Sequence, residues 1–185
     1  GNLMRTGVGA GSRSILVRRA VEEMVPLENW LRDVASNHGA SIDGVPSLRG
    51  LLGLGPGLTP AGDDVLGGIM VALHGLGFAD QAMKLYAKAS PDITEHGNPV
   101  GASHLAAASE GAASEKVHAA MGAVMTNGEA ALETALDGVD GVGHTSGWDA
   151  LSGIVTVLRI WCDVSRRSGQ KPTCLRASNR IYDQE

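Results

Sequence analysis

Two adjacent carboxylates, Asp63 and Asp64, follow a glycine-rich loop and stand in the first turns of a predicted helix, where residues 53–64 read GLGPGLTPAGDD. Thr59 is a good N-cap residue, and Pro60 suits the first helical position because its missing N–H needs no partner there. One acid is enough to complement the positive end of the helix dipole. The second acid is therefore a candidate to face a ligand.

A weaker copy of this motif returns near the C-terminal end, where residues 143–154 read GHTSGWDALSGI. Aligning the two motifs pairs Asp64 with Asp149 and Gly68 with Gly153. Apolar residues then recur at helical spacing in both copies, which predicts one buried stripe on each helix. Two similar glycine-loop–helix units in one small chain predict that two helix N-termini share one function.

The donors of these two loops suit a small oxyanion, because helix N-termini present backbone N–H groups and a positive dipole end. The expected ligand-binding residues are Arg49, Gly55, Gly57, Thr59, Gly62, Asp63, Thr145, Ser146 and Gly147, and the expected catalytic residues are Asp64, Asp149 and His144. Asp64 and Asp149 could orient an amide, bind a proton or hold a divalent ion. His144 could bond an anion or act as a general acid, although a loop histidine in solvent is the simpler interpretation.

A purely structural use of the same residues also stays open. Ser146 can cap the second helix, with Asp149 three residues on, in an arrangement similar to a capping box. Arg49 could pair with a bound phosphate or carboxylate, or form a salt bridge to Asp63. Capped helices with an acid in the first turn are common without any ligand.

Histidine and cysteine spacing gives no metal site. Cys162 and Cys174 form no Cys-x-x-Cys pair, and they read as reduced thiols of a cytoplasmic protein. His104 and His118 have no acid at ligand spacing. No cofactor is predicted, apart from the divalent ion that Asp64 and Asp149 could hold.

Composition excludes two classes of partner. The formal charge is −5 with a pI near 5.6, and aromatic residues make up only 3 % of the chain, so neither a basic face nor a stacking surface for nucleic acid is present. The longest apolar run, residues 65–76, is too short for a bilayer span of about 20 residues.

The elements that must position the two motifs are helices. Helical periodicity and stop signals recur from Ser14 to Val164, and no alternating strand pattern occurs, which predicts an all-α, single-domain helical bundle. We expect a flexible N-terminal segment over 1–13, a helical domain over 14–168 and a C-terminal tail over 169–185. Glycine-lined faces predict that the two motif helices pack against each other.

Within that bundle, Pro26 is expected to break or kink the first helical segment, and residues 90–101 are expected to form the longest loop. A short helix is expected over 46–52, before the first motif.

The two motifs together resemble a bacterial family that includes the AllH-type subunits of oxamate carbamoyltransferase, a family long catalogued as uncharacterised. The resemblance spans about residues 45–162. It implies a part in allantoin and purine-ring breakdown, where oxalurate and phosphate give oxamate and carbamoyl phosphate, or the reverse. It also implies larger partner subunits.

Two functions follow from the sequence. The first is a carbamoyltransferase subunit that binds a small anion, such as phosphate, carbamoyl phosphate or an oxamate-like molecule, between two helix N-termini. The alternative is a non-catalytic structural or interaction subunit of a multi-subunit metabolic complex. The first requires both loops to open on one pocket, whereas the second allows them to be buried or apart.

Overall fold

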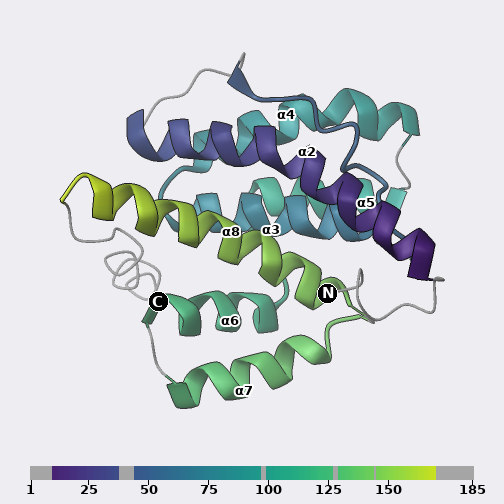
Figure 1. Cartoon of the computed structure of the whole chain (residues 1–185). Helices are drawn as coiled ribbons and strands as arrows, with labels where there is room; N and C mark the ends of the chain where they lie inside the picture. The colour runs from purple at the N-terminus through teal and green to yellow at the C-terminus, as the bar shows by residue number, and fades with distance from the viewer. Residues whose placement is uncertain (1–9, 38–43, 97–98, 127–128, 144, 170–185) are drawn as a thin grey trace.

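The computed structural model describes residues 10–37, 44–96, 99–126, 129–143 and 145–169. In these ranges the chain forms helices and turns and no strand, which confirms the all-α prediction. Figure 1 shows the helices in chain order, which are α2 (Ala10–Asn37), α3 (Ala61–Gly75), α4 (Ala79–His96), α5 (Pro99–Ser109), α6 (Glu115–Thr126), α7 (Glu129–Asp140) and α8 (Ser146–Arg167).

Helix α3 forms the centre of the fold. Between Ala61 and Leu73 every residue except Val65 is buried, and beyond the two aspartates of its first turn this stretch is made of apolar residues and glycine, as expected for a helix enclosed on all sides. Helices α4, α5 and α8 pack directly on α3, while α2 packs on α8. Helices α6 and α7 form a pair beside α8 (Figure 1). The first motif therefore begins the most enclosed helix of the molecule.

The closest helix contact joins α3 to α8 through two glycines. A Cβ atom on Gly68 would overlap the carbonyl oxygen of Ala150, and one on Gly153 would overlap the carbonyl oxygen of Val65. Because Val65 and Ala150 occupy equivalent places in the two motifs, the contact is reciprocal, as a pseudo-twofold axis requires. This confirms the prediction that the two motif helices pack on each other.

Two prolines lie inside helices instead of ending them. Helix α2 continues through Pro26, and α4 continues through Pro91, so that most of the loop expected over 90–101 is helix. Both prolines are exposed, so the carbonyl that loses its hydrogen bond at each site can meet water. The expected helix break at Pro26 and the loop expected from residue 90 were therefore wrong, whereas the alternative of a kink at Pro26 stays a prediction.

The ends of the predicted segments also differ. Helix α2 begins at Ala10, inside the segment that was expected to be flexible. The helix expected over 46–52 is only a turn, in which Leu51 and Leu52 donate to the carbonyl of Leu48. Most of the expected C-terminal tail lies outside the described residues.

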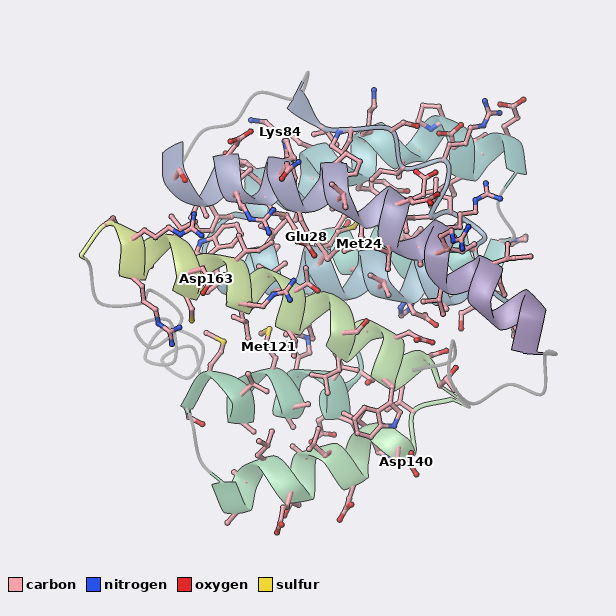
Figure 2. All side chains as sticks on the ribbon, viewed as in Figure 1. Met24, Glu28, Lys84, Met121, Asp140 and Asp163 are labelled. Carbon is pink, nitrogen blue, oxygen red and sulfur yellow. The ribbon has the colours of Figure 1, made fainter. Side chains whose placement is uncertain are left out.

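Polar contacts tie the outer helices to α8. Glu28 of α2 accepts a hydrogen bond from Arg159 at 3.0 Å, and Figure 2 shows Glu28 between α2 and α8. Asp140, at the end of α7, accepts from the indole N–H of Trp148 at 3.0 Å. Within the described ranges, no helix has the length and apolar character needed to cross a membrane.

The glycine contact gives a stability prediction. We expect Gly68→Ala to destabilise the protein by about 1–3 kcal/mol, because the new methyl group must displace the Ala150 backbone. Gly138→Ala in α7 is the matched control, since a Cβ there lies 3.8 Å from the nearest atom, on the Lys116 side chain. The control should gain about 0.5–1 kcal/mol from its helix-favouring methyl group. Urea unfolding measures both, and equal stabilities would contradict the close contact.

Candidate functional site

Asp63 holds the glycine loop in place. Its Oδ1 atom accepts a hydrogen bond of 2.8 Å from the backbone N–H of Gly53, a residue whose φ of 70° suits glycine. Burial raises the pKa of Asp63, while the Gly53 hydrogen bond and the nearby His104 oppose that rise. One member of the adjacent pair of acids therefore organises the loop.

The two motif loops meet through a pair of hydroxyl groups. Thr59 Oγ1 and Ser146 Oγ lie 2.7 Å apart and share a hydrogen bond. Neither residue caps its helix as expected, because the N-cap positions belong to Pro60 and Thr145, and neither cap makes a side-chain hydrogen bond. The hydroxyls that the sequence assigned to capping instead join the two loops across 87 residues of chain.

Asp64 is the most enclosed carboxylate of the site, with 1 % of the residue exposed. In the part of the chain that the structure describes, neither of its carboxylate oxygens has a partner in hydrogen-bonding geometry. Burial raises the pKa of Asp64 to about 7, the hydroxyls of Ser146 and Thr59 lower it, and the charges of Asp149 and Asp63 raise it further. Near neutral pH, this group exchanges between its acid and its carboxylate.

A small cavity of about 60 Å³ lies beside Asp64, between α3, α5, α6 and α8. Asp64, His104 and Ser146 contribute polar groups to its lining, whereas Val71 and Ala108 contribute apolar walls. Asp64 from the first motif and Ser146 from the second thus face the same space. The arrangement can present a proton donor or acceptor to a group of a few atoms.

His104 of α5 is the residue that the sequence analysis missed. Its Nε2 atom lies 3.7 Å from Oδ1 of Asp64, and its side chain is 40 % exposed while that of Asp64 is 2 % exposed. Burial lowers the pKa of His104, and the charge of Asp63 opposes this. The His104 imidazole therefore lies between the cavity and the solvent, where it can transfer protons from one to the other.

The sequence did hold a signal for His104. It lies three residues after Gly101 and four before Ala108, both of which are buried. A histidine on the small-residue face of a helix points toward the neighbouring helix, and Gly67 of α3 leaves room for the ring, since a Cβ added to Gly67 would lie 3.4 Å from Nε2. The acid beside His104 comes from α3, a different helix, so spacing along the chain does not show the pair.

Asp149 occupies the equivalent place at the start of α8. It is 4 % exposed, and its backbone N–H donates to the carbonyl of Thr145, as that of Asp64 donates to Pro60. Its charge acts on Asp64 through space and raises the pKa of that group. Asp64 and Asp149, which align in sequence, therefore also occupy equivalent positions at the starts of α3 and α8.

Other expected ligand residues have partners within the fold. The N–H of Gly62 donates to Leu54, and that of Gly147 donates to Val142. Arg49 forms ion pairs with two acids of α4, Asp92 at 3.6 Å and Glu95 at 3.7 Å.

Three expected residues remain at the loops. Gly57 lies on the exposed part of the first loop and Gly55 is partly buried there, while Thr145 is buried at the start of α8. His144 lies outside the described residues. Among the residues that the structure describes, no three histidine, cysteine, aspartate or glutamate side chains come together as metal ligands.

The raised pKa of Asp64 gives a pH prediction. An unfolded Asp titrates near 3.9, so between about pH 4 and 7 the folded protein holds a proton that the unfolded chain releases. The contribution of Asp64 to the free energy of unfolding is complete below about pH 4 and is lost as pH rises through about 7. Asp64→Asn removes this titration. The variant should gain roughly 2–4 kcal/mol relative to wild type across that interval, at about 1.4 kcal/mol per pKa unit.

Chemical unfolding at a series of pH values measures this difference. Asp137→Asn, which changes an exposed carboxylate of α7, is the matched control and should follow the wild-type curve. A constant difference between Asp64→Asn and wild type from pH 4 to 7.5 would show that Asp64 is ionised throughout.

Comparison with known proteins places the chain in a family. The family described as oxamate carbamoyltransferase subunit AllH matches residues 51–158, which is more than half of the chain and includes both motif loops. Neither a curated protein nor a solved structure matches the chain. The matched segment begins just before the glycine loop and ends within α8, so it contains Asp64, His104 and Asp149. The chain belongs to the family of oxamate carbamoyltransferase subunit AllH.

Proposed function

We propose that this protein works as a subunit of an oxamate-type carbamoyltransferase of allantoin and purine-ring breakdown. Its substrate is a small anion, held where the loops before α3 and α8 meet. The family supports the reaction class. The observation that carries the site is the 2.7 Å contact between Thr59 and Ser146, because it joins the two motif loops beside one cavity.

The protonation of Asp64 removes the main electrostatic objection to an anion at this place. Three buried carboxylates, Asp63, Asp64 and Asp149, would repel a phosphate or a carboxylate if all were ionised. With a pKa of about 7, Asp64 can hold a proton and donate a hydrogen bond instead. The hydroxyls of Thr59 and Ser146 add donors, and the net charge of −5 means that attraction must be local.

Asp64 and His104 can also carry the proton that carbamoyl transfer requires. When a phosphate oxygen attacks the carbamoyl carbon of oxalurate, the new C–O bond forms and the C–N bond to the oxamate nitrogen breaks. That nitrogen must then take up a proton, and the reverse reaction must remove one. Asp64 can supply or accept this proton, and His104 can exchange it with solvent across the 3.7 Å that separates the two side chains.

Other enzyme subunits complete the proposal. The family name describes a subunit, so we expect larger partners to supply the remaining substrate contacts, in the cytoplasm. The alternative function is a non-catalytic structural or interaction subunit. It is favoured by the structural uses of Asp63, Gly62 and Gly147, each of which bonds to this chain's own backbone.

Anion binding should depend on pH. Oxamate keeps one negative charge from pH 5.5 to 8.5, so a change in its affinity reports on the protein. Isothermal titration of the chain with its partner subunits should show weaker binding as pH rises through about 7, because Asp64 loses its proton. Asp64→Asn should remove the step that is centred on this pKa. If millimolar phosphate, carbamoyl phosphate and oxamate all fail to bind, the carbamoyltransferase function is wrong and the interaction subunit remains.

Activity should separate the two functions. In the reconstituted enzyme, Asp64→Asn and His104→Gln should each lower carbamoyl transfer by about 10²–10⁴-fold, the usual contribution of a positioned acid or base. Asp137→Asn is the control and should keep full activity. Melting temperatures at neutral pH should show that the variants remain folded. Full activity in both site variants would favour the structural function.

A further inference from the structure

We infer that the cavity beside Asp64 and His104 is a pocket for an uncharged carboxamide, so that the amide end of the substrate enters it while the anionic end stays at the loops. This inference rests on the proposed function, because it divides the same site into two parts. It assigns the cavity a ligand chemistry and makes it the part of the site that distinguishes an amide from a carboxylate.

The lining of the cavity has two chemical halves. Asp64, His104 and Ser146 place hydrogen-bonding groups around one part, while Val71, Ala108 and other small apolar side chains enclose the rest. The described residues contribute no lysine or arginine to this lining. The anionic end of the substrate lies at the loops, and a second negative charge placed in the cavity would lose its hydration without gaining a cation. Such burial is strongly unfavourable.

Asp64 supplies the specific partner for an amide. A protonated carboxyl has one O–H donor and keeps acceptor capacity on its oxygens, and one hydroxyl proton from the Thr59–Ser146 pair fills only part of that capacity. The Asp64 O–H can donate to the carbonyl of an amide, whose NH₂ group donates to the other Asp64 oxygen. The buried and unsatisfied oxygens of Asp64 therefore point to a ligand that brings N–H donors.

The size of the cavity agrees with this chemistry. A volume of about 60 Å³ is several times the roughly 10–15 Å³ that one buried water requires. A carboxamide has only three heavy atoms and is planar. A tetrahedral phosphate is larger and carries more charge, so it fits better at the exposed loops than between α3 and α5.

Gly67 allows this space to be tested without disturbing the fold. It lines the cavity, and a Cβ added to it would lie 3.4 Å from Nε2 of His104 and 3.6 Å from Cβ of Ala108. These are ordinary contacts, so Gly67→Ala reduces the cavity and also favours the helix. The neighbouring Gly68 would be unsuitable because its added methyl group strikes the backbone of α8.

The experiment compares oxamate with oxalate, which has nearly the same shape but a carboxylate in place of the amide. The described lining residues belong to this chain, and ligand-detected NMR on the chain together with its partner subunits measures binding, with sulfate as a probe of the loops. We expect oxamate to bind at least about tenfold more tightly than oxalate, since a charge buried without a partner is penalised.

The Gly67→Ala variant tests whether oxamate occupies the cavity. Gly67→Ala should weaken oxamate binding by about tenfold, because a single misplaced methyl group is worth roughly that much in a pocket of fixed shape. It should leave sulfate binding and folding intact. Gly138→Ala, which places its methyl group against Lys116 and not at a residue of the cavity lining, is the matched control and should bind oxamate as wild type does.

The outcomes distinguish the two proposals. If the chain binds sulfate but binds oxalate as tightly as oxamate, or if Gly67→Ala leaves oxamate affinity unchanged, the amide pocket is wrong and the anion site stands. If oxamate binds with the expected selectivity but sulfate does not bind, the pocket stands and the anion site at the loops is wrong. Failure of all three ligands overturns both.

Discussion

The backbone contact between α3 and α8 is the constraint on which the rest of the structure depends. Gly68 and Gly153 let the two helices approach until each meets a carbonyl oxygen of the other. This close approach brings the two preceding loops together, so that Thr59 and Ser146 can share a hydrogen bond. Larger side chains at either glycine would separate the loops as well as the helices. Packing and site geometry are therefore set by the same pair of residues.

Asp63 and Asp64 show how one turn of helix can direct two adjacent acids into different surroundings. Adjacent helical residues point about 100° apart. Asp63 thus reaches back to the N–H of Gly53, while Asp64 faces the cavity and His104. The bonded acid keeps the loop in place, and the unbonded acid keeps a pKa near neutrality. Burial raises the pKa of both acids; the Gly53 hydrogen bond opposes that rise at Asp63, and the charges of Asp149 and Asp63 add to it at Asp64.

Much of the fold was predictable because helical periodicity and small-residue faces are local signals. They gave the all-α class and the pairing of α3 with α8 through Gly68 and Gly153. Continuous helix at Pro91 was not predictable, because the tolerance of a proline depends on whether its side of the helix is exposed. The surroundings of the candidate site residues were predictable only in part. His104 approaches from another helix, and Arg49 binds acids of α4, so both depend on tertiary contacts that spacing along the chain does not show.

The loop-to-loop hydrogen bond also has a consequence for the order of folding. Thr59 and Ser146 are 87 residues apart in the chain, and contacts between such distant residues form slowly because the intervening chain must first lose its freedom. During synthesis, α3 leaves the ribosome well before α8. Until α8 docks, Gly68 and the apolar face around it have no partner within the chain. The proposed ligand site thus forms only with the last described helix, and a nascent chain that lacks α8 carries the first motif without the second.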